Sequence, residues 1–204
     1  GLCSHHSRLK DHVTLDFRPA MEALLRHFAA QGCRRVGYMG RAENFHPEEQ
    51  RFAVYAQFLE AQGLEPIHFP LPETDDLSRS AREELIAYLR AGRPLPDALF
   101  CQNDEMALGA YRALHEAGVA VPENVLLSGC DDIPYIRYLE TPLTSLSLPA
   151  EAICQQGWRL LLNRMQNPDS PPAQVTLEAS LVVRDSTRRY PGGSPSIPGG
   201  ESPL

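Results

Sequence analysis

The sequence predicts an α/β fold in which a parallel sheet is covered by helices on both faces. Two observations support this prediction. Short apolar runs alternate with amphipathic segments from residue 16 to residue 129, and a glycine ends each amphipathic segment. A strand, a helix and a further strand in this order form right-handed crossovers, which give parallel strands. We therefore expect a three-layer α/β/α arrangement.

The first element is an amphipathic helix. Its apolar residues recur at helical spacing, Asp16 ahead of Pro19 supplies the N-terminal cap region, and Gly32 ends the pattern. The units that follow are a strand at 36–40 with a helix ending at Gly63, a strand at 67–69 with a helix ending at Gly92, a strand at 98–101 with a helix ending at Gly118, and a strand at 125–129.

The pattern changes after residues 131–132. A short turn, an extended run at 143–148, a helix at 153–165 and a strand-like run at 181–183 follow. The remainder is rich in Gly, Pro and Ser. We predict a poorly defined N-terminal segment (1–12), one lobe (13–139), returning segments of a second lobe (140–189) and a disordered tail (190–204).

Composition restricts the class of function. The 204 residues carry 19 Lys and Arg against 26 Asp and Glu, a net charge of −7, so we expect no direct nucleic-acid binding by this stretch. No apolar run of about 18 residues is present, which disfavours membrane insertion, and no signal sequence is visible at the start. The five cysteines form no C-x-x-C pair, and we expect reduced thiols in a cytoplasmic protein.

Polar residues follow three of the predicted strands. In a parallel sheet the loops at the carboxyl ends of the strands bring separate segments to one crevice. Guanidinium, amide and carboxylate groups there suit a polyhydroxylated ligand, because Asn and Asp bridge adjacent hydroxyls and Arg donates in a fixed fork. The residues in question are Arg41, Glu43, Asn44, Arg51, Gln102, Asn103, Asp104, Asp131 and Asp132.

Several of these residues also have purely structural interpretations. Asn103 or Asp104 is suited to capping the helix that begins there. Asp131 and Asp132 are suited to a turn in which their side chains bond nearby backbone amides. Arg51 is placed to pair with Glu48 on the surface of its helix.

Motifs for catalysis are absent from the sequence. There is no G-x-S-x-G elbow, no H-E-x-x-H or other metal spacing and no phosphate-binding loop. His5 and His6 are interpreted as a solvated pair, and Cys101 and Cys130 as small core residues. We expect no catalytic residue, no metal and no cofactor.

Four segments together resemble the lac repressor/galactose repressor family of transcriptional regulators. They are RRVGYMG at 34–40 followed by Arg51, PDALFCQNDEMALGAYRALHEAGVAVPENVLLSGCDD at 96–132, TPLTSLSLPAEAI at 141–153 and LVVRDST at 181–187. The resemblance implies a sensor of the periplasmic-binding-protein type I fold, here one near-complete lobe plus part of a second. It implies effector contacts by Asp16, Arg51, Asn103 and Asp131, of which Asp131 and Arg51 are the safer two.

The same resemblance implies how such a protein works. A small effector, a sugar in our first interpretation, binds between two lobes, and a homodimer changes its affinity for operator DNA. The family's helix-turn-helix head and the first half of its sensor do not occur in this sequence. We expect that the operator is bound through a head that this chain does not contain.

The sequence departs from the family at three positions. Val54 replaces the usual glycine after Arg51, and Leu77 and Ala150 stand where galactoside-binding members often have aromatic rings. A stacking platform for a sugar is therefore not evident, although Phe17, Phe45 and Tyr135 are candidates for packing or for stacking. Two rival functions remain: a solute-binding protein of a sugar transporter, and an α/β enzyme with Asp131 or Asp132 as its base.

Overall fold

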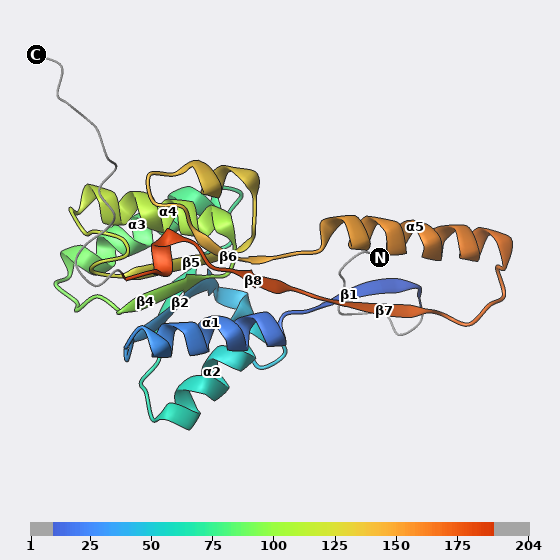
Figure 1. The fold of residues 1–204 in the computed structure, drawn as a ribbon, viewed down its shortest axis with the longest axis horizontal. Helices are drawn as coiled ribbons and strands as arrows, with labels where there is room; N and C mark the ends of the chain where they lie inside the picture. Colours follow the sequence, from blue (N-terminus) through green and yellow to red (C-terminus); the bar gives the residue numbers. More distant parts are fainter. Residues whose placement is uncertain (1–9, 190–204) are drawn as a thin grey trace, which may run out of the picture.

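The structure is a computed structural model that describes residues 10–189 (Figure 1). Six strands form the larger of its two sheets. The strand order is β3-β2-β4-β5-β6-β8. All neighbours are parallel except β6 and β8. The strands are β2 (Val36–Arg41), β3 (Ile67–Leu71), β4 (Ala98–Cys101), β5 (Leu126–Asp131), β6 (Thr144–Ser147) and β8 (Ser180–Val182).

Helices cover both faces of this sheet. Helices α1 (Arg18–Ala30) and α2 (Gln50–Gln62) lie on one face, and α3 (Leu77–Arg90) and α4 (Asp104–Glu116) lie on the other (Figure 1). Each face has its own apolar core. Ala98 and Phe100 of β4 belong to one core, and Leu99 and Cys101 to the other, because successive side chains of a strand point to opposite faces. The predicted three-layer fold with a mostly parallel sheet is confirmed.

The predicted helix ends are confirmed as well. Gly32, Gly63, Gly92 and Gly118 all have positive φ angles, between 64° and 82°. Glycine has no Cβ and adopts this left-handed conformation without the steric cost that other residues incur. The chain can therefore turn from each helix toward the next strand within a few residues.

A smaller unit extends from one end of the main body (Figure 1). Strand β1 (His12–Asp16) pairs in parallel with β7 (Gln174–Glu178), and helix α5 (Ala150–Gln166) packs against both. The prediction that Asp16 supplies the cap region of the first helix is confirmed, because its Oδ1 accepts the amide of Arg18, the first residue of α1, at 2.9 Å, although Asp16 does not occupy the N-cap position. Asp16 ends β1, and the N-cap position belongs to Phe17, because residues 12–16 pair with a strand about 160 residues further along the chain.

The division into sheets does not coincide with the predicted boundary between residues 139 and 140. Strands β6 and β8, from the segment predicted to return to a second lobe, lie in the large sheet, whereas β1 pairs with β7. The chain thus passes between the two units after β1, after β6 and after β7. The predicted tail at 190–204 and most of the N-terminal segment lie outside the described residues.

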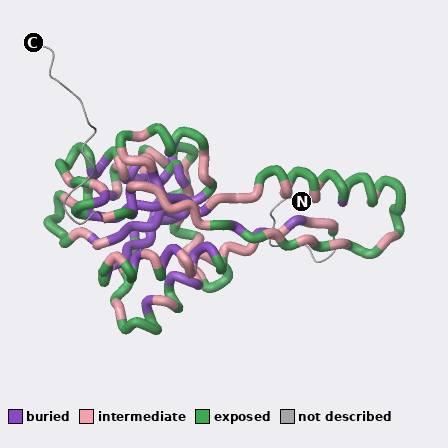
Figure 2. Tube along the Cα trace, viewed as in Figure 1, coloured by how far each residue is buried: buried purple, intermediate pink, exposed green. Residues whose placement is uncertain are grey.

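Helix α5 has an exposed apolar face. Figure 2 shows most of this helix as exposed. Trp158, Leu161, Leu162 and Met165 recur at the spacing of one helical face, with 62% of Trp158 and 70% of Met165 exposed. A hollow of about 840 Å³ lies between this helix and β1 and is lined by Val13, Trp158 and Leu161 among others. Among residues 10–189, no helix has the length and apolar character that crossing a bilayer requires.

The packing of α3 against α4 depends on a glycine. A Cβ built on Gly109 would overlap the carbonyl oxygen of Ser78, which no side-chain rotation relieves. We expect Gly109→Ala to lower the free energy of unfolding by about 2 kcal/mol or more, as overpacking does. Gly118→Ala meets nothing within 4 Å but has a φ of +68°, so it should cost only about 1 kcal/mol. Chemical denaturation measures both; equal losses would contradict the close approach.

Candidate functional site

Arg51 lies where three strand ends meet. It belongs to the first turn of α2, and its Nη1 donates to the carbonyl oxygen of Gln102, just after β4, at 2.9 Å. The same nitrogen lies 3.7 Å from the sulfur of Cys130 in β5. Its guanidinium also stacks 4.7 Å above the ring of Phe17, just after β1. These contacts come from three segments that are distant in the sequence.

The contact residues of Arg51 are the immediate neighbours of the other predicted site residues. Phe17 follows Asp16, Gln102 precedes Asn103, and Cys130 precedes Asp131. The structure therefore places Arg51, Asn103 and Asp131 at one edge of the large sheet, and the contact with Phe17 brings the end of β1, with Asp16, beside them. Their contact with an effector stays a prediction, because this edge is described without a ligand.

A neighbouring carboxylate orients Arg51, but it is not the one considered from the sequence. Arg51 Nε donates to Glu49 Oε1 at 2.8 Å, so the pairing with Glu48 is wrong. Glu49 precedes α2 and caps it, since Oε2 accepts the amide of Phe52 at 2.8 Å and the hydroxyl of Tyr38 at 3.1 Å. A carboxylate that is itself held by two other donors fixes the guanidinium in one position.

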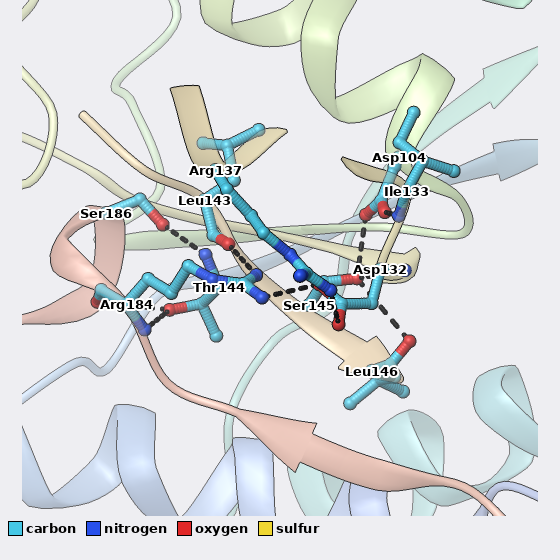
Figure 3. A network of polar contacts seen from close by, with 10 residues as sticks. All are labelled: Asp104, Asp132, Ile133, Arg137, Leu143, Thr144, Ser145, Leu146, Arg184 and Ser186. Atoms are coloured by element: carbon cyan, nitrogen blue, oxygen red, sulfur yellow. Dashed lines mark hydrogen bonds and ion pairs between the residues drawn. The ribbon is translucent and has the colours of Figure 1, made fainter. Parts of the chain in front are cut away.

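The residues after β4 have different roles. Asn103 caps α4, because its Oδ1 accepts the amide of Met106 at 2.9 Å. Asp104 does not cap the helix, which contradicts that interpretation of the sequence. It is the first residue of α4 and is fully buried, with Oδ1 accepting the hydroxyl of Ser145 at 2.8 Å and Oδ2 accepting the amide of Ile133 at 2.9 Å (Figure 3).

The two carboxylates after β5 also differ. Asp131 ends β5 and is exposed as a residue, but the protein atoms around its carboxyl exclude part of the solvent and raise its pKa, against the lowering effect of Arg51. Asp132 is held by arginines and not by the backbone amides expected for a turn pair. Its Oδ1 accepts Arg184 at 2.6 Å and its Oδ2 accepts Arg137 at 3.0 Å. Of these two carboxylates, that of Asp131 has no ion pair with an arginine among residues 10–189.

Gln102 contributes to the site in a way that sequence reasoning missed. Its side-chain Oε1 accepts the amide of Arg41 at 3.2 Å and Nδ2 of Asn44 at 3.0 Å, which joins the end of β4 to the loop after β2. Its Nε2 is buried without a hydrogen-bond partner among the described residues. The position after a strand was the only signal in the sequence; the partner residues are some 60 positions away.

Two of the three aromatic candidates for stacking, Phe17 and Phe45, are otherwise engaged. Arg51 covers a face of the Phe17 ring, and Phe45 packs edge-on against Tyr38 at 5.4 Å. Tyr135 is 75% exposed. Leu77 is buried in the core beneath α3.

Among the described residues, the site contains groups suited to hydrogen bonding but no metal-binding cluster and no activated nucleophile. Within residues 10–189, no cluster of His, Cys, Asp and Glu is arranged to hold a metal ion. Burial raises the pKa of the Cys130 thiol to about 12, so this sulfur is neutral at physiological pH. Cys101 and Cys130 are both fully buried, as core residues should be. Arginine, amide and carboxylate groups at the carboxyl edge of a parallel sheet are suited to hydrogen bonding with a small polar molecule.

Comparison with known proteins gives the family. Residues 25–187 match the family described as "Periplasmic binding protein-like domain", and the chain belongs to this family. The HTH-type transcriptional repressor MelR of Bacillus subtilis is 31% identical over 187 residues, covering 86% of this chain and 52% of MelR. The chain thus spans about half the length of the curated relatives it matches. The resemblance to lac repressor/galactose repressor regulators is confirmed.

Comparison with solved structures gives the same family. A LacI-family regulator from Sanguibacter keddieii is 35% identical, with a TM-score of 0.78 over 90% of this chain and 69% of that one. A LacI-family regulator from Arthrobacter sp. FB24, solved in complex with lactose, is 25% identical, with a TM-score of 0.80 over 92% of this chain and 70% of that one.

The buried carboxyl of Asp104 should make stability depend on pH. Burial raises its pKa from 3.8 to about 6, with two hydrogen bonds opposing the shift and Asp131 and Asp132 adding to it. Because the folded chain holds this proton more tightly than the unfolded chain, the contribution of Asp104 to stability is greatest below pH 4 and is lost as pH rises through 6. The loss is on the order of 3 kcal/mol.

Asp104→Asn removes this titration. We expect the stability of the variant relative to wild type to rise between pH 4 and pH 6 and to level off above pH 7, in urea unfolding at each pH. Asp75→Asn, at an exposed carboxylate, serves as the control. A difference between Asp104→Asn and wild type that stays constant from pH 4 to pH 8 would contradict the assignment.

Proposed function

We propose that this chain is the effector-sensing part of a bacterial DNA-binding transcriptional regulator, and that its effector is a sugar. One observation carries the proposal: Arg51 joins the segments that carry Asp16, Asn103 and Asp131 at one edge of a parallel sheet. The relatives support it, since MelR is a repressor and the Arthrobacter regulator holds lactose. We place Asp16, Arg51, Asn103 and Asp131 in contact with the sugar.

The sensing mechanism follows from the three passages of the chain between its two units. Effector binding favours one arrangement of the units over another, and a homodimer transmits the difference to operator DNA through a head outside these 204 residues. Such coupling is commonly worth about 1 to 3 kcal/mol. The chain acts in the cytoplasm as a repressor, with no catalytic step and no cofactor.

The exposed apolar face of α5 fits a sensor of which only part is present. Trp158, Leu161, Leu162 and Met165 would be covered by the remainder of the second lobe, since the curated relatives are about twice as long as the matched region. The net charge of −7 also favours a separate DNA-binding segment. The names of the relatives favour a regulator over a transporter's solute-binding protein.

Sugar binding tests the proposal directly. We expect isothermal titration calorimetry with lactose, cellobiose, galactose and ribose to detect binding of at least one sugar. Arg51→Ala should weaken that binding about a hundredfold, because a buried charged hydrogen-bonding group is lost where the sugar hydroxyls sit. Arg79→Ala is the matched control, since Arg79 lies on the exposed surface of α3. Equal affinities of the two variants would remove Arg51 from the site.

The gene provides a second test. We expect the DNA upstream of the Gly1 codon to encode further residues that begin with a helix-turn-helix, by analogy with the relatives, of which the match covers about half. Sequencing that region settles the point. A signal sequence in its place would support the transporter protein instead.

A further inference from the structure

The turn that carries Asp131 has an unusual backbone. Asp131 has a φ of 110° and Asp132 a φ of 56°, and neither is glycine. Residues other than glycine rarely adopt a positive φ, and such conformations persist only where the surrounding structure holds them. The described contacts should therefore include the groups that hold this turn.

Two buried side chains from other elements hold the turn (Figure 3). The amide of Asp132 donates to Ser145 Oγ at 3.1 Å, and the Ser145 hydroxyl donates to Asp104 Oδ1 at 2.8 Å. The amide of Ile133 donates to Asp104 Oδ2 at 2.9 Å. Two consecutive amides of the turn are thus linked to the Asp104 carboxylate: that of Ile133 directly, and that of Asp132 through the Ser145 hydroxyl.

The position of Asp104 leaves it little freedom. Asp104 and Ser145 are both fully buried. A Cβ built on Gly129, two residues before Asp131, would overlap Asp104 Oδ1, so the carboxylate lies directly against the backbone of β5. A glycine at 129 is what allows the carboxylate to reach the turn.

The same turn is tied to the segments that connect the two units. Ser145 belongs to β6, which leads into α5, and Arg184, which binds the Asp132 carboxylate at 2.6 Å, follows β8. Arg184 also donates to the carbonyl oxygen of Leu143 at 2.7 Å, just before β6. A change in the path of either connecting segment would therefore reach the turn through Ser145 or Arg184.

We propose that Asp104 and Ser145 form a clamp that fixes the Asp131–Asp132 turn and so positions the Asp131 carboxylate for the effector. Neither residue touches the effector in this proposal; both act through the backbone. The part that concerns the effector rests on the proposed function, whereas the clamp itself does not.

The test compares two serine variants. Ser145→Ala removes the hydroxyl that links Asp132 to Asp104. Ser128→Ala is the matched control, because Ser128 is also fully buried, lies on the adjacent strand β5 and has a hydroxyl without a hydrogen-bond partner among the described residues. Ser145→Thr, which keeps the hydroxyl, should restore what Ser145→Ala loses.

The first readout needs no ligand. Amide hydrogen exchange by NMR should show the Asp132 amide exchanging at least about tenfold faster in Ser145→Ala than in wild type, with no change in Ser128→Ala. The three-bond amide coupling of Asp131, which reports φ, should change only in Ser145→Ala. Exchange of the Asp132 and Ile133 amides in the wild-type chain at the rate of unprotected amides would overturn the clamp, even if the variant did not fold.

The second readout is affinity for a sugar that the wild-type chain binds, among the four named above. Ser145→Ala should weaken binding about tenfold, and Ser128→Ala by less than about twofold. A mobile turn with unchanged affinity would overturn the positioning role. If none of the four sugars binds while the exchange difference is present, the sugar proposal fails and the clamp stands.

Discussion

The parallel direction of β2, β3, β4, β5 and β6 is the constraint from which the rest of this structure follows. Parallel neighbours need a crossover after each strand, so every carboxyl end is placed at the same edge of the sheet. The loops at that edge carry the guanidinium, amide and carboxylate groups. Strands β2, β4, β5 and β6 are buried on both faces, so polar side chains gather at the strand ends without a loss of core packing.

Arg51 turns this edge into one site. Its contacts with Gln102, Cys130 and Phe17 connect β4, β5 and the end of β1, although the two sheets are separate. Glu49 holds the guanidinium in place and caps α2 at the same time. The orientation of the Arg51 guanidinium, which we propose contacts the effector, is thereby coupled to the start of its helix.

Buried polar groups hold together the segments beside this edge of the sheet. Asp104 is enclosed by apolar core yet accepts two hydrogen bonds, so its desolvation is only partly offset and its pKa is raised. Asp132 is neutralised by Arg184 and Arg137. These groups lie where the chain passes between its two units, and they link α4, β5, β6 and the segment after β8 by directional bonds that apolar packing does not provide.

The sequence by itself determined the layers and predicted the sheet edge at which we propose the site. Apolar runs alternating with amphipathic segments, and glycines at 32, 63, 92 and 118, predict the strands, the helices and their ends, because these depend on local periodicity and on backbone freedom. Only the tertiary structure decided the pairing of β1 with β7, the partner of Arg51 and the buried role of Asp104. The strand pairing and the contacts of Asp104 join residues about 30 to 160 positions apart in the sequence. Glu49 and Arg51 are close in the sequence, but their pairing depends on the direction of their side chains. Local pattern carries no information on which distant donor meets which acceptor.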